Sequence, residues 1–229
     1  MERSTGMDVP ENTALPVSEY FGAAGEVRDG PQGFLVDPFP ANSKVGAHFH
    51  SSDQFQVFFG SHGSWYQRSD LEGVVVHYAD AYTTYGPFGM RENPMRFFTL
   101  RREASTVTGY MPGARDQLVR RGRRTLHVHV EDRSDPKTVL MEDCDGLSAC
   151  IYRGDFGKGL PVGSPAGSGG QYHLVLEGEV SVNGERYGEL ALGWMSPRSR
   201  PAQISVASSS GASLLVLQFP NPDSARRVA

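Results

Sequence analysis

The side chains in this sequence best suited to bind a metal ion are two histidines separated by one residue, His48 and His50. Residues i and i+2 of a β-strand point to the same face of the sheet, so on the inner face of a small barrel both imidazoles would face its cavity. Imidazole suits Fe, Zn, Ni and Cu ions. The pair therefore predicts a site for a divalent transition metal.

Further ligands and a proton-transfer group have to come from neighbouring strands. His77 is a candidate ligand, and Gln54 is a neutral oxygen donor whose lack of charge would weaken the binding of a hard divalent ion. Tyr82 or Tyr85 could act as a general acid or base if a nearby metal lowers its pKa. The alternative is a pair of cavity histidines that hydrogen bonds satisfy without a metal.

Other histidines and several arginines remain open in role. His127 and His129 share the i, i+2 spacing, but no motif surrounds them, and exposed strand histidines are the simpler interpretation. His173 could face a second cavity or lie in the core. Four arginines could bind a carboxylate through paired hydrogen bonds or be surface charges: Arg91, Arg96, Arg101 and Arg102.

The elements that must position these residues are short strands. The 27 glycines and 15 prolines interrupt the chain at short intervals. Between them lie runs of four to seven residues rich in Val, Phe, Tyr, Leu and Ile, the length and composition of strands. These runs are 55–59, 74–78, 96–100, 126–130, 172–176 and 214–219. Helical periodicity is almost absent, with room for one turn at 115–121, so the sequence predicts an all-β sandwich or barrel.

The chain also contains an internal repeat. The segment from His48 to Gly60 and the segment from Gln171 to Val180 each place a glutamine at the start of an apolar strand that ends in glycine. The dipeptide Asn183-Gly184 supplies the positive φ angles of a two-residue type I′ turn, and therefore predicts a hairpin over 178–188.

At these repeats the sequence resembles the cupin superfamily, whose first motif is Gly-x5-His-x-His-x3-4-Glu-x6-Gly. His48-Phe49-His50 matches the two histidines, Gln54 stands at the glutamate position, and Gly60 follows one residue early. The last histidine of the second cupin motif falls at Tyr85, with His77 in the preceding strand. In the second copy Gln171 takes the glutamate position, 166–170 lacks His-x-His, and Ala202 stands where the second motif has its histidine.

The resemblance implies two cupin-type (jelly-roll) β-barrel modules in tandem, at 20–115 and 116–229. It implies a metal site in the first module at His48, His50, Gln54 and His77, and a degenerate site in the second. Cupin barrels often pair through edge strands, so a homodimer is expected.

Composition excludes several classes of protein. The formal net charge of -4 argues against a nucleic-acid-binding protein, and the isolated basic run at 120–124 reads as a linker or a partner contact. Two cysteines, Cys144 and Cys150, make neither a disulfide framework nor a zinc finger. No apolar stretch suits a signal peptide or a membrane span, so a cytoplasmic protein without membrane contact is expected.

Three hypotheses for function follow. The first is a metal-dependent enzyme acting on a small organic molecule. Iron and dioxygenase-like chemistry lead, because few protein ligands leave positions open for O2 and substrate. Mn, Ni, Zn and Cu remain open, as does a lyase or isomerase that uses the metal as a Lewis acid. The second is a metal-free small-molecule-binding protein or sensor. The third is a structural subunit of a partner enzyme.

Overall fold

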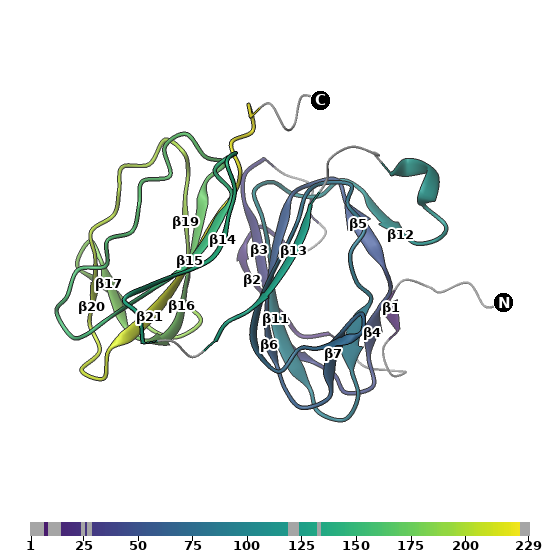
Figure 1. Cartoon of the computed structure of the whole chain (residues 1–229), viewed down its shortest axis with the longest axis horizontal. Helices are drawn as coiled ribbons and strands as arrows, with labels where there is room; N and C mark the ends of the chain where they lie inside the picture. The colour runs from purple at the N-terminus through teal and green to yellow at the C-terminus, as the bar shows by residue number, and fades with distance from the viewer. Residues whose placement is uncertain are drawn as a thin grey trace. The chain divides into compact units, whose positions relative to one another are not determined.

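The structure, a computed structural model, describes residues 7–8, 15–23, 26, 29–118, 124–131 and 134–224 of the 229-residue chain. The chain divides into two compact units, Met1–Val130 and Glu131–Ala229. All elements of the described residues are β-strands except a short 3₁₀ helix, η1 (Arg115–Gln117), so the all-β prediction is confirmed (Figure 1).

The described residues of the first unit form thirteen strands, which pair in antiparallel fashion. They are β1 (Met7–Asp8), β2 (Val17–Phe21), β3 (Gln32–Phe39), β4 (Lys44–Val45), β5 (His48–His50), β6 (Gln54–Gly60), β7 (Ser64–Tyr66), β8 (Ser69–Asp70), β9 (Gly73–Ala79), β10 (Phe88–Met90), β11 (Met95–Arg101), β12 (Thr108–Tyr110) and β13 (Thr125–His129).

The main sheet of the first unit has the order β13-β9-β6-β11-β3-β2, and a second sheet has the order β1-β4-β10-β7-β8. Strands β5 and β12 form a separate pair. The two sheets share an apolar core that includes Val36, Phe58 and Phe97 from the main sheet and Val45 and Phe88 from the other. Alternation along the strands therefore directs Phe58 and Phe97 inward together with their i–2 neighbours Gln56 and Met95.

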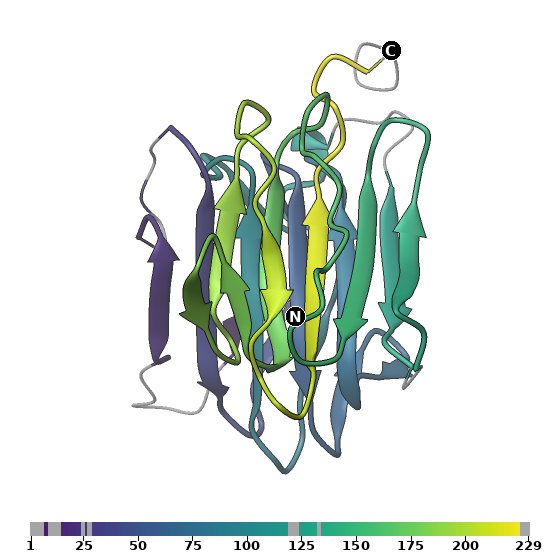
Figure 2. The same cartoon turned by 90° about the vertical axis from the view of Figure 1, so that its left-hand side faces the viewer.

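In the second unit, residues 134–224 form eight strands: β14 (Lys137–Glu142), β15 (Ser148–Gly154), β16 (Gln171–Gly178), β17 (Val180–Val182), β18 (Glu185–Tyr187), β19 (Leu192–Met195), β20 (Ile204–Val206) and β21 (Ala212–Gln218). They form a sheet of order β14-β15-β21-β16-β19 and a smaller one of order β18-β17-β20. In Figure 2 this unit, coloured green to yellow, shows its long antiparallel strands lying side by side.

The predicted hairpin at Asn183-Gly184 is confirmed. Strands β17 and β18 pair across it, with φ of 53° at Asn183 and 95° at Gly184. The division between the units lies after Val130. The strand β13, which the sequence analysis placed in the second module, pairs with β9 in the first unit.

The structure also bears on the two cysteines, the basic run at 120–124 and membrane-spanning segments. Both cysteines are free thiols, Cys144 exposed and Cys150 buried. Arg124 is the described member of the basic run, and its guanidinium pairs with Asp80 at 3.1 Å; residues 119–123 lie outside the described part. No helix in the described ranges is long and apolar enough to span a membrane.

Candidate functional site

The predicted histidine pair lies on the short strand β5. Tyr85 forms a β-bridge with His48 on one side of the strand, and β12 pairs with β5 on the other, where Thr108 faces His50. The rings of His48 and His50 contact each other, with centroids 5.1 Å apart, and the ring of Tyr85 lies 4.4 Å from that of His48. The pair is thus brought together with Tyr85, as the spacing and the cupin resemblance predict.

A buried guanidinium lies at the centre of these residues. Arg101, at the end of β11, is only 7% exposed, and the strand register places it opposite Gln54 of β6 and Gln32 of β3. Its Nε donates to Oε1 of Gln54 at 2.8 Å, and its Nη1 donates to Oε1 of Gln32 at 2.6 Å. Its Nη2 lies 3.2 Å from Nε2 of His50 and donates to it.

These contacts test whether the predicted ligands fit a metal ion. The Nδ1 of His50 lies 3.0 Å from the hydroxyl of Thr108, and its Nε2 lone pair accepts from Arg101. A metal at Nε2 would lie about 2 Å away along that same lone pair, in the space that the guanidinium fills. Oε1 of Gln54 is also committed to Arg101. The donor set of this arrangement therefore does not fit a metal ion. The positive charge of the Arg101 guanidinium would also repel a metal cation.

The remaining predicted ligands do not complete a site either. His48 uses Nδ1 for a hydrogen bond to the carbonyl of Gly46 at 2.7 Å, which leaves Nε2 as its lone-pair nitrogen. His77 lies on β9 and contacts the ring of Tyr85 at 5.1 Å. Within the described ranges, no cluster of three or more His, Cys, Asp or Glu side chains could hold a metal.

The two tyrosines predicted to act in proton transfer lie in different surroundings. The hydroxyl of Tyr85 accepts a hydrogen bond from the amide of Gln54 at 2.6 Å, and burial raises the pKa of Tyr85 well above its ordinary value. Tyr85 is therefore a neutral phenol at physiological pH. Tyr82 lines a hollow with Ser51 and Glu103, and its ring lies 5.8 Å from that of Phe49.

A second group of aromatic side chains lies further along the main sheet of the first unit. His77 and His127 face each other across β9 and β13, with ring centroids 5.9 Å apart, and the ring of Tyr66 stacks on that of His127 at 4.6 Å. None of the four imidazole nitrogens makes a hydrogen bond of ordinary geometry with a described residue. His127 is therefore part of this group, whereas His129 is exposed, as the simpler interpretation has it.

Burial controls the charge of these histidines. Loss of solvation lowers the pKa of His48 to about 4 and that of His77 to about 3. The pKa of His50 is also far below its usual value, through burial first and then through the neighbouring charge of Arg101. All three rings are neutral near pH 7, because a charged imidazole in this interior would be poorly solvated.

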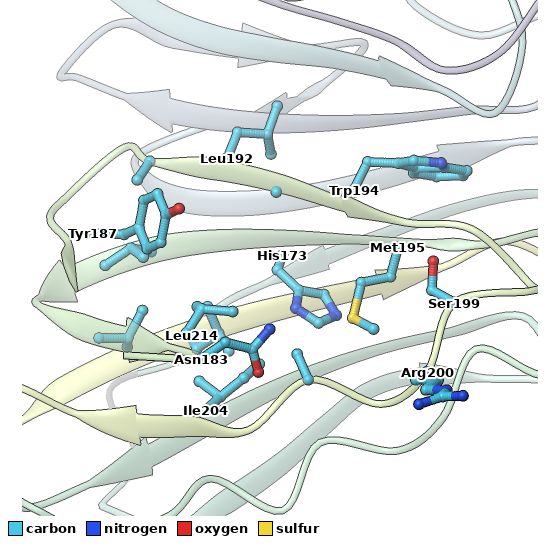
Figure 3. A pocket seen from close by; sticks show the side chains of 16 residues that line it. His173, Asn183, Tyr187, Leu192, Trp194, Met195, Ser199, Arg200, Ile204 and Leu214 are labelled. Atoms are coloured by element: carbon cyan, nitrogen blue, oxygen red, sulfur yellow. The ribbon is translucent and has the colours of Figure 1, made fainter. Parts of the chain in front are cut away.

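The second unit has a different interior. A cavity of about 400 Å³ is lined mainly by apolar side chains, among them Leu214, Ile204 and Met195 (Figure 3). His173 points into this cavity from β16, and burial lowers its pKa to about 4. Ala202, at the position of the lost motif histidine, also lines it.

Arg101 is the residue whose role the sequence left open between carboxylate binding and surface charge. The sequence does carry one sign that Arg101 could face the interior. Phe97, Thr99 and Arg101 alternate along β11, so all three lie on one face of the sheet. That pattern does not say which face is inward. Gln32 carries no motif at all, and only the register of β3 against β11 brings it to Arg101.

No protein-family model and no curated protein matches this sequence. Solved structures, however, are similar over most of the chain. One is salicylate 1,2-dioxygenase from Pseudoaminobacter salicylatoxidans with gentisate, which is 11% identical, has a TM-score of 0.56, and covers 92% of this chain and 75% of that one. Another is the bacterial pirin YhhW from Escherichia coli in complex with nickel(II), which is 9% identical, has a TM-score of 0.56, and covers 96% and 94%. The predicted bicupin fold is therefore confirmed.

The buried neutral histidines predict that the first unit loses stability in mild acid. An unfolded histidine takes up a proton near pH 6.5, whereas folded His48 and His77 do so only near pH 4 and 3. Below about pH 6.5 the unfolded chain binds more protons, so the free energy of unfolding falls by up to about 1.4 kcal/mol per pH unit per histidine. Urea unfolding between about pH 7 and pH 5 measures this slope.

The matched variant is His77→Phe, which keeps a planar ring and removes one titrating group. Its slope should be shallower by up to about 1.4 kcal/mol per pH unit, the contribution of one proton, with the full difference reached at about pH 5. An equal slope in the two proteins would contradict a neutral, buried His77.

Because Arg101 occupies the acceptor atoms of His50 and Gln54, we expect the protein to bind little metal. As purified, the chain should hold less than about 0.1 equivalent of Fe, Mn, Ni, Cu or Zn by plasma mass spectrometry. The double variant Arg101→Met, Gln54→Glu frees the lone pair of His50 and supplies a carboxylate. It should bind about one equivalent of Co²⁺, seen in its visible absorption.

Adding His48→Ala to the double variant should abolish the cobalt spectrum, and circular dichroism checks that each variant is folded. About one equivalent of metal in the unmodified protein, lost in His48→Ala, would show instead that Arg101 leaves the site and that the predicted ligands bind metal.

Proposed function

We propose that this chain is a metal-free bicupin that binds a small organic molecule in the cavity of its second barrel. The observation that supports this proposal most directly is the cavity itself. Its volume of about 400 Å³ lies within the range of small-molecule sites, and its apolar lining carries a few polar groups such as His173, Asn183 and Ser199.

The first barrel supports the same proposal by its contents. Where a metal-binding cupin would present free histidine and carboxylate ligands, Arg101 takes up the acceptor atoms of Gln54 and His50. A guanidinium is permanently charged, so no change of pH in the physiological range would release those atoms.

A metal-dependent enzyme of the dioxygenase, lyase or isomerase type is the second candidate. It is favoured by the fold shared with salicylate 1,2-dioxygenase and with the nickel-bound pirin, and by the lone pair at Nε2 of His48. It requires Arg101 to move out of the first barrel, which would leave the Oε1 atoms of Gln32 and Gln54 without the buried hydrogen bonds that Arg101 donates.

The proposal predicts that an apolar bicyclic compound, 1-methylindole, binds in the second barrel. In ¹H–¹³C spectra the methyl group of Met195 should shift, while those of Met90 and Met95, in the first unit, should not. For a compound of this size the expected dissociation constant is about 1 mM or tighter.

Gly193→Leu is the blocking variant. A Cβ at Gly193 would lie 3.9 Å from the Cβ of His173 and 4.0 Å from its carbonyl oxygen, both ordinary contacts. Because Gly193 pairs with His173, the larger side chain would lie on the face from which His173 points into the cavity. It should abolish the shift, whereas Gly188→Leu, where a Cβ meets nothing within 4 Å, should not. Equal binding to both variants would place the compound outside the cavity and refute the proposal.

A further inference from the structure

We infer that the second-barrel cavity takes a neutral, largely apolar molecule that donates one hydrogen bond, through an N–H or O–H group, to Nδ1 of His173. This inference rests on the proposed function and adds the chemical class of the ligand. Its basis is a chain of hydrogen bonds that fixes which nitrogen of His173 carries the proton.

The chain of hydrogen bonds starts at backbone carbonyls, which can only accept. The amide nitrogen of Gln218 donates to the carbonyl of Gly146 at 2.6 Å, so Oε1 of Gln218 faces the other way. That oxygen accepts from Nε2 of Gln171 at 2.7 Å, and the same Nε2 lies 3.3 Å from the carbonyl of Gly163. Both contacts require the amide nitrogen of Gln171 on that side, and its Oε1 on the side of His173.

The remaining step sets the tautomer of His173. Oε1 of Gln171 lies 3.1 Å from Nε2 of His173, and an oxygen with no proton can only accept. Nε2 therefore carries the proton, and Nδ1 of the neutral ring is a bare acceptor. Among the described residues, no side chain or backbone group donates to Nδ1, and Figure 3 shows the ring directed into the cavity.

The other polar groups of the cavity do not suit an anion. Arg200 is exposed, so solvent screens its charge. The ring of His173 is neutral near pH 7, because burial lowers its pKa to about 4. A ligand that fills the cavity, among apolar side chains such as Val175, Leu214 and Met195, excludes water from Nδ1 of His173. Such a ligand has to bring its own donor, since an acceptor left unpaired away from water is costly.

The test compares indole, which carries one N–H donor, with 1-methylindole, which has none. In the unmodified protein, at neutral pH, indole should bind about fivefold more tightly than 1-methylindole, the value of one buried hydrogen bond. In His173→Phe, which keeps an aromatic ring and removes the acceptor, the two compounds should bind about equally. The ratio of affinities is the readout, so a general loss of binding in the variant does not affect it.

A second measurement needs no substitution at the site. Long-range ¹H–¹⁵N spectra of the unmodified protein should show Nε2 of His173 protonated and Nδ1 bare. The resonance of Nδ1 should move on addition of indole and stay nearly fixed with 1-methylindole. In Gln171→Met, which removes the acceptor that positions the ring, both tautomers should appear, and the preference for indole should fall.

The outcomes separate this inference from the proposed function. Equal affinity of both compounds, with both still blocked by Gly193→Leu, would overturn the ligand class and leave the cavity as the site. So would a protonated Nδ1, or tighter binding of benzoate that is lost in Arg200→Gln. If neither compound binds, or Gly193→Leu changes nothing, the proposed function itself fails.

Discussion

A buried glutamine amide opens an inner strand of the main sheet in each unit, β6 and β16, and its hydrogen bonds have to be completed from the neighbouring strand. In the first barrel Gln54 lies opposite Arg101, and in the second Gln171 lies opposite Gln218. Both partners end strands of seven residues, β11 and β21, that pair with the glutamine strand in the same sense. Because an unpaired buried amide is costly, the partner residue decides which way each amide points.

That choice gives the two interiors different chemistry. Arg101 can only donate hydrogen bonds, and it donates to Oε1 of Gln54 and to the lone pair of His50. These atoms are therefore not available to bind a metal cation. Gln218 accepts from Gln171, which turns the oxygen of Gln171 to His173 and leaves Nδ1 of that ring as an acceptor at the cavity. One barrel thus holds its own cation, and the other presents a neutral acceptor in an apolar space.

Local patterns predicted much of this fold, and long-range register accounts for the rest. The strand runs, the Asn183-Gly184 turn and the contact between His48 and His50 follow from neighbours in sequence, and the cupin resemblance placed Tyr85 beside them. The meeting of His77 with His127 depends on the pairing of β9 with β13, across the 115/116 division expected from the sequence. Likewise Arg101 reaches Gln32 only because β11 pairs with β3, which no short motif reveals. The expected homodimer stays a prediction.

The most direct test of this account is a crystal of the unmodified protein soaked in nickel(II) at neutral pH, with anomalous scattering recorded at the nickel edge. The account predicts no anomalous peak among His48, His50 and Gln54, and electron density for the Arg101 guanidinium between Gln54, Gln32 and His50. A strong peak bonded to His48 and His50, with Arg101 displaced, would contradict it.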